Sequence, residues 1–143
     1  MYEKDYILRI IEQAGVMLRA MLTSLREQRP EDVRDTSREA LTLLLGIPPA
    51  LTDSLAPAGL LTLLSAGGRF DAKRGRLAAE VYVRRVQADR AVGLSETTDA
   101  DRAKALRLLS AVIESGDAED VEEAHALLAE LGEEGPPAGV ETS

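Results

Sequence analysis

Apolar residues recur every three or four positions through the start of the chain, and this spacing constrains the fold more than any other feature. Between residues 4 and 28 the spacings alternate between four and three, as in a long helix that packs against other helices. Further apolar residues widen the stripe beyond the arc of about 100° that a surface helix buries. We therefore predict one long helix with an unusually wide apolar face. The central seam consists of Ile7, Ile11, Ala14, Leu18, Met21 and Leu25.

Proline and glycine divide the rest of the chain into further helical segments. Proline suits the first turn of a helix and glycine its end, so Pro30 and Pro57 mark helix starts while Gly46 and Gly116 mark helix ends. Short connections place consecutive helices antiparallel. We predict an all-α fold of five to six antiparallel helices without a sheet. The further predicted segments are helices over 30–46, 57–67, 71–92, 98–116 and 117–132, one turn at 50–55 and a polar loop at 94–98.

The composition agrees with a single helical domain. Hydrophobic residues make up 45% of the chain, which is typical of a globular protein, and Leu and Ala favour helix. We place this domain at residues 1–132 and interpret 133–143 as a disordered acidic tail, because it combines Gly and Pro with a single bulky apolar residue, Val140. The absence of cysteine excludes disulfides and thiolate metal sites.

Charge is distributed unevenly along the chain. Residues 1–90 carry 14 basic and 12 acidic side chains, whereas residues 91–143 carry 3 basic and 13 acidic ones. An acidic final third argues against a nucleic-acid partner. The sequence contains no run of about 18 apolar residues that would predict a membrane span, and its start lacks a secretory leader. We therefore expect a cytoplasmic protein. The preference for Arg over Lys suggests a bacterial genome of high GC content.

Two segments show a weak internal repeat of helical-hairpin type. Leu60 and Gly68 lie 48 positions before Leu108 and Gly116, and in both segments a Leu-rich helix meets a Gly-containing turn before an Ala-rich helix. Small residues let two antiparallel helices approach closely in such units. The pattern predicts a tetratricopeptide-like arrangement built from two helical hairpins.

The first residues also resemble those of an uncharacterised bacterial family. The chain begins Met-Tyr-x-x-Asp-Tyr-Ile-x-Arg-x-Ile, and this start resembles the signature of a domain of unknown function. The resemblance is close over residues 1–20 and looser over 58–92. It implies a long first helix followed by a tetratricopeptide-like hairpin, and it implies no activity. At the tetratricopeptide turn Gly68 and Phe70 fit the pattern, but Lys73 stands where alanine is usual.

The wide face of the first helix is a candidate self-association surface. Its apolar residues exceed what one core requires, so a second surface must cover the remainder. Two interpretations are open: a homodimer through this helix, or burial by the later helices of the same chain. The candidate residues are Ile7, Leu8, Ile11, Leu18, Leu22 and Leu25.

Two polar motifs are further candidate sites. Lys73, Arg76 and Arg84 share one side of a predicted helix and form a candidate basic face for a partner protein. The alternatives are that these side chains pair with the acidic final third or stay solvated. Glu122 and His125 stand three positions apart, as in a di-iron helix, but His125 is the only histidine, so one chain cannot complete that site. We expect no cofactor and no metal.

By elimination, the sequence favours a protein–protein interaction or assembly module whose partner is unidentified. The motifs of phosphate loops, nucleophile elbows and zinc proteases are missing from the sequence. We therefore do not expect an enzyme. The alternatives are a homo-oligomeric structural or regulatory protein without a separate partner, and a small-ligand binder or an enzyme that uses Asp, Glu, Tyr or Lys.

Overall fold

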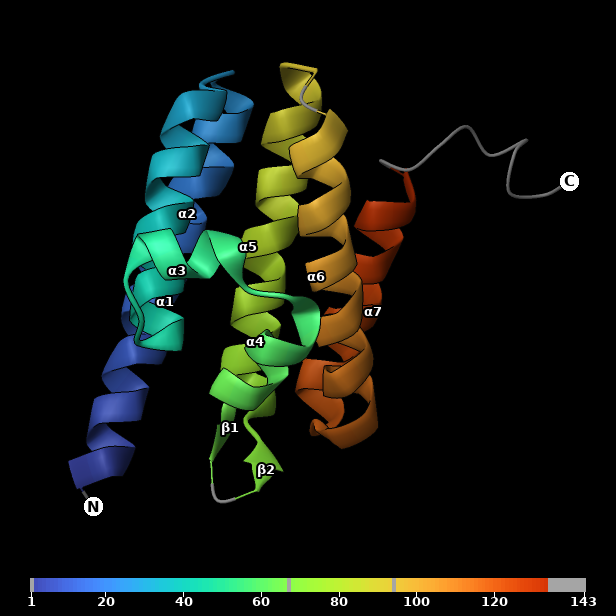
Figure 1. Cartoon of the computed structure of the whole chain (residues 1–143). Helices are drawn as coiled ribbons and strands as arrows, with labels where there is room; N and C mark the ends of the chain where they lie inside the picture. Colours follow the sequence, from blue (N-terminus) through green and yellow to red (C-terminus); the bar gives the residue numbers. More distant parts are fainter. Residues whose placement is uncertain (1, 67, 94, 134–143) are drawn as a thin grey trace, which may run out of the picture.

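A computed structural model describes residues 2–66, 68–93 and 95–133, over which the chain is an all-α helical bundle (Figure 1). This confirms the predicted fold class. The described residues form seven helices rather than five or six, because the turn predicted at 50–55 is a helix of its own. The elements are α1 (Tyr2–Arg26), α2 (Pro30–Leu45), α3 (Pro49–Ser54), α4 (Pro57–Leu63), β1 (Ser65–Ala66), β2 (Arg69–Phe70), α5 (Ala72–Ala91), α6 (Ser95–Ser115) and α7 (Ala118–Glu133).

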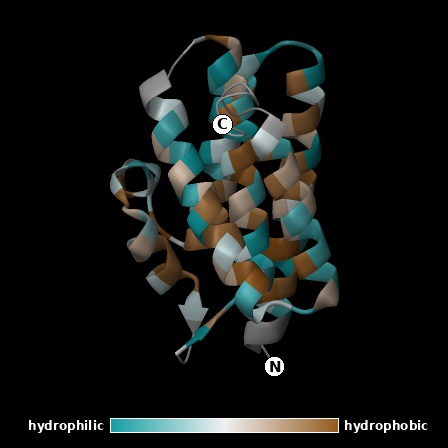
Figure 2. Ribbon diagram, turned by 90° about the vertical axis from the view of Figure 1, so that its right-hand side faces the viewer, coloured by the Kyte–Doolittle hydropathy of each residue, from teal (hydrophilic) through white to brown (hydrophobic). Residues whose placement is uncertain are grey.

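Helix α5 is the centre of the bundle and packs against α1, α2, α6 and α7. Because it has neighbours on several sides, charged as well as apolar side chains of α5 are buried, including Arg84, Arg85 and Asp89. Small residues such as Ala78 and Ala79 let the neighbouring helices come close. Figure 2 shows hydrophobic and hydrophilic residues alternating along the long helices, as expected for helices with one covered face.

Helix α1 buries a row that differs slightly from the predicted seam. Ile10, Ala14, Leu18 and Met21 are buried, whereas the predicted seam residue Ile11 is only half-buried. The covered stripe is wide because α1 packs against two helices, α2 and α5. The chain's own later helices therefore bury much of this face, but not all of it.

The predicted start and stop residues explain most of the helix boundaries. Pro30 occupies the first turn of α2, and Gly46 ends this helix in the left-handed conformation with φ 72°, donating its N–H to the Thr42 carbonyl at 2.9 Å. Asp71 caps α5 by accepting the backbone N–H of Arg74 at 3.1 Å. At the start of α7, the side chain of Asp117 accepts the N–H of Asp120 at 2.9 Å.

The predicted loop at 94–98 was wrong. Helix α6 already begins at Ser95, directly after the turn at Gly93, whose φ is 76°. Thr98, at the end of the predicted loop, is a buried residue of this helix. Gly132, predicted as a helix stop, lies inside α7, which continues to Glu133; the rest of the predicted tail lies outside the described residues.

The predicted pairing of 57–67 with 71–92 as one repeat unit was also wrong. Helix α4 spans only seven residues, too few to run along α5, and it packs on α6 instead. We predicted no sheet, but the turn at Gly68 pairs β1 with β2 in a ladder of two residues each. This minimal hairpin reverses the chain between α4 and α5. Among the described helices, none is long and apolar enough to cross a membrane.

Candidate functional site

The candidate basic face is an internal contact between α5 and α7. Lys73 Nζ lies 3.4 Å from Asp120 Oδ2 and is also within 4 Å of Asp117 and Glu119. Arg76 Nε donates to Asp120 Oδ1 at 3.0 Å. The acidic final third of the chain thus neutralises the cluster, which was one of the alternatives left open by the sequence.

Arg84 makes the shortest of these contacts. Its Nη1 lies 2.5 Å from Glu130 Oε1 on α7, and its Nη2 lies 3.4 Å from Glu80 Oε2 on its own helix. The Arg84 side chain is only 7% exposed. A partner protein therefore cannot reach its guanidinium without displacing α7, and the three basic side chains do not form a free docking face.

The candidate self-association residues fall into three groups. Leu18 is part of the core and is unavailable to a partner. Leu8 is 50% exposed and points to solvent. The remaining four are half-buried at the edges of the helix–helix contacts: Ile7, Ile11, Leu22 and Leu25.

Two further apolar side chains extend the exposed part of α1. Tyr6 is 66% exposed and Val16 is 57% exposed. Leu8 and Val16 lie about 80° apart around the helix axis, and we call this pair the outer face of α1; Tyr6 projects from another side of the helix, about 160° from Leu8. The wide apolar pattern predicted such a surplus, but the assignment of individual residues needed the packing of α2 and α5.

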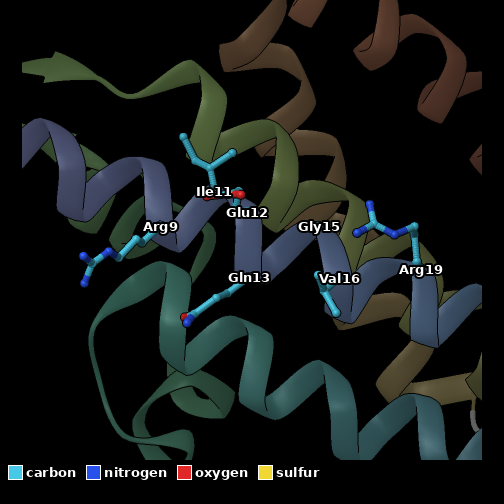
Figure 3. Close-up of a pocket in the computed structure, with 7 residues that line it drawn as sticks. All are labelled: Arg9, Ile11, Glu12, Gln13, Gly15, Val16 and Arg19. Carbon is cyan, nitrogen blue, oxygen red and sulfur yellow. The ribbon is translucent and has the colours of Figure 1, made fainter.

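A shallow hollow of about 470 Å³ lies on this helix around Gly15. Figure 3 shows Glu12 on one side of Gly15 and Arg19 on the other, with the Arg19 guanidinium turned back toward the glycine. The missing side chain at position 15 is the reason why the surface dips here. The complete lining is Arg9, Ile11, Glu12, Gln13, Gly15, Val16 and Arg19.

Glu122 and His125 are both exposed on α7. Among the described residues, no group of three or more His, Asp or Glu side chains is arranged to hold a metal ion. Glu122 and His125 therefore occupy the solvent side of an amphipathic helix, which was the alternative interpretation of this motif.

Sequence reasoning missed a buried polar cluster where α5 meets α6. Arg85 Nε donates to Asp101 Oδ2 at 3.2 Å, and the Arg85 and Asp101 side chains are 7% and 3% exposed. The Lys104 ammonium lies 5.5 Å from the ring centre of Tyr82, and the Arg85 guanidinium lies 5.9 Å from the same centre. Asp89, fully buried, lies on the same face of α5 as Arg85.

Residues of α2 and α3 complete the surroundings of this cluster. Arg34 Nε on α2 lies 3.4 Å from Asp89 Oδ1, and Asp53 Oδ1 on α3 lies 3.7 Å from Arg85 Nη1. The cluster thus connects four helices. A signal for it exists in the sequence, because Ala78, Tyr82, Arg85 and Asp89 follow at spacings of four, three and four and so form one helix face.

Burial shifts the protonation equilibria of the cluster. It raises the pKa of Asp101 to about 6, against the opposing effect of the Arg85 guanidinium. It also raises the pKa of Asp89, although Arg34 and Arg85 act in the opposite direction. Burial lowers the pKa of the Lys104 ammonium and raises the pKa of the Tyr82 hydroxyl.

The carboxyl groups of Asp89 and Asp101 affect each other, since the Asp89 charge raises the pKa of Asp101 and a hydrogen bond with the Asp101 side chain lowers the pKa of Asp89. Among the described residues, no N–H or hydroxyl group donates a hydrogen bond to either carboxylate oxygen of Asp89. The Arg34 guanidinium supplies the opposite charge nearest to Asp89, with its Nε 3.4 Å from Asp89 Oδ1.

The cluster contains residue types that serve in acid–base chemistry, but the fold closes it. Tyr82, Arg85, Asp89, Asp101 and Lys104 are each at most 7% exposed. A reacting substrate must come within hydrogen-bond reach of its acid or base. In this conformation the cluster acts as a polar contact between helices and offers no open active site.

No family model, curated protein or solved structure matches this chain. The resemblance of residues 1–20 to an uncharacterised bacterial family consequently stays a prediction.

Proposed function

We propose that this protein is a protein–protein interaction or assembly module and that the outer face of α1 is its docking surface. The observation that carries the proposal is the exposure of Leu8 and Val16, each half or more in solvent on this face. Among the described residues, the exposed large apolar side chains outside α1 are Leu51, Val92 and Leu106, which lie in three different segments. Apolar surface gathered on one element favours a role in association.

The rest of the molecule fits the role of a rigid support for α1. The polar cluster connects α2, α3, α5 and α6. The ion pairs of Arg76 and Arg84 connect α7 to α5. A preformed helix loses little conformational freedom when it docks, which favours binding. We place this role in the cytoplasm, on the sequence features given above.

Two alternatives come from the same surface and from the interior. A homo-oligomeric structural or regulatory protein would use the outer face of α1 without a separate partner. A small-ligand binder or an enzyme would have to open the buried polar cluster, so the closure of that cluster favours the interaction role.

Affinity capture from a lysate of the source cells tests the proposal. We expect the tagged chain to retain a discrete protein, and the double variant Leu8→Glu, Val16→Glu to lose it, because two charges would be desolvated in the contact. Leu106→Glu, an exposed apolar position on α6, is the matched control. Equal capture by all three proteins would rule out α1 as the docking surface.

A further inference from the structure

Gly15 is a residue of α1 that the fold itself does not require. It lies in the interior of a 25-residue helix, where glycine costs about 1 kcal/mol relative to alanine. A Cβ atom placed there would meet only the Nη1 atom of Arg19, at 3.8 Å, which is an ordinary contact. Among the described glycines, the positive φ values belong to Gly46, Gly68 and Gly93, so the backbone at Gly15 does not need glycine either.

A close approach from outside the chain would explain this glycine. Helices that cross tightly carry a small residue at the crossing point, because a larger one would hold the two backbones apart. Gly15 lies in the hollow of α1 and has the half-exposed Leu8 seven residues before it and the half-buried Leu22 seven residues after it. Apolar side chains therefore flank the glycine on both sides along the helix.

Two charged residues near the glycine are placed so that two copies of α1 can form ion pairs with each other. Glu12 and Arg19 lie on one side of α1 and are placed symmetrically about the midpoint between Gly15 and Val16. They are about 10 Å apart along the axis, too far for the ion pairs that form at spacings of three or four residues. Within the described part of the chain, no ion pair involves either of them.

In an antiparallel pair of α1 helices centred on that midpoint, each Glu12 faces the partner's Arg19. Both ion pairs follow from one two-fold axis, as in an isologous interface. In the same register Leu8 lies within one residue, about 1.5 Å along the axis, of the level of the partner's Leu22. A different protein would need to carry a matching pattern of its own, whereas a second copy of this chain already has it.

We propose that two copies of this chain associate through antiparallel α1 helices that cross at Gly15. This inference rests on the proposed docking role of α1 and names its occupant. The contact joins the Gly15 backbones at the crossing, the Leu8 and Leu22 side chains on either side of it, and two reciprocal pairs of Glu12 with Arg19.

Sedimentation equilibrium of the full chain at about 100 µM tests the proposal through four variants. We expect the parent to be a dimer of the 15.4 kDa chain. Gly15→Leu should raise the dimer dissociation constant at least tenfold, because its side chain fills the crossing point. Glu12→Arg or Arg19→Glu alone should do the same, because each places like charges opposite one another twice. The combined swap of both charges should restore the parent constant to within about threefold.

Circular dichroism distinguishes loss of the dimer from loss of the fold. Each variant should keep the parent helix content, since the Cβ of residue 15 has space and both charged side chains are exposed. A monomeric parent, or a dimer that Gly15→Leu and both single reversals leave unchanged, would overturn the proposal. The parent could be a monomer that still captures a protein from the lysate, with that capture lost in the Leu8→Glu, Val16→Glu variant. This result would overturn the second copy as the occupant while the docking role of α1 stands.

Discussion

The buried pair of Asp89 and Asp101 predicts that acidification stabilises this protein over a defined pH range. Asp101 has a pKa of about 6 in the fold, against an ordinary value of 3.8. A group whose pKa is raised by folding contributes stability that is complete below its unfolded pKa and is lost as the pH rises through its folded pKa. The window for Asp101 therefore runs from about pH 4 to pH 6, and burial of Asp89 adds to the effect in the same direction.

The expected size follows from the shift of Asp101. One pKa unit corresponds to about 1.4 kcal/mol. Protonation of Asp101 at pH 5 removes part of the free-energy cost of holding its ionised carboxylate in the buried site. Between pH 7 and pH 5 we expect Asp101 to add about 1 kcal/mol to the free energy of unfolding. Asp101→Asn removes the titration and keeps a group that can hydrogen-bond with Asp89.

Urea denaturation followed by circular dichroism at pH 5 and pH 7 measures this difference. The parent should gain about 1 kcal/mol more on acidification than Asp101→Asn does. Asp99→Asn, an exposed position on the same helix, should behave like the parent. An identical pH response in all three proteins would refute the reasoning, and so would a larger gain in Asp101→Asn.

Three further predictions concern the stability of the helical bundle. Arg84→Met should lower the free energy of unfolding by about 2 kcal/mol, a small effect for a buried ion pair because the Glu130 side chain is 38% exposed. In the same urea titration, Glu130→Gln should lower the free energy of unfolding by less than about 1 kcal/mol. Asp71→Ala should cost about 1 kcal/mol through loss of the α5 cap, and equal stability of the two proteins would contradict the capping role. Deletion of 133–143 should leave the melting temperature nearly unchanged, and a drop of many degrees would show that this segment docks.

The sequence predicted the helices well because their boundaries are local. Pro30, Gly46 and Asp71 act within one turn of their own helix, so the sequence alone indicates the helix boundaries that these residues set. The apolar spacing correctly predicted the long helix α1, and α2 and α5 together cover much of its wide apolar face. These features depend on spacing and on backbone conformation, and neither requires knowledge of the neighbours.

The candidate sites could not be read in the same way because they depend on which helices meet. Lys73 and Arg76 follow the pattern of a basic face, but α7 brings Asp120 against both. The cluster of Arg85 with Asp101 joins residues of two helices, and the sequence alone does not tell which face of α6 meets α5. Helix α4 was placed wrongly for a related reason, since its length and not its composition decides that it packs on α6.

Site-specific photo-crosslinking in cells tests the docking role of α1 most directly. A photoreactive amino acid replaces Leu8 or Val16 on the outer face of α1, or Leu106 on α6 as the control. The account predicts one discrete crosslinked product from both positions on α1, whether the captured protein is a second copy or another chain, and none from position 106. Crosslinks from position 106 alone, or none from either position on α1, would contradict the docking role of this helix.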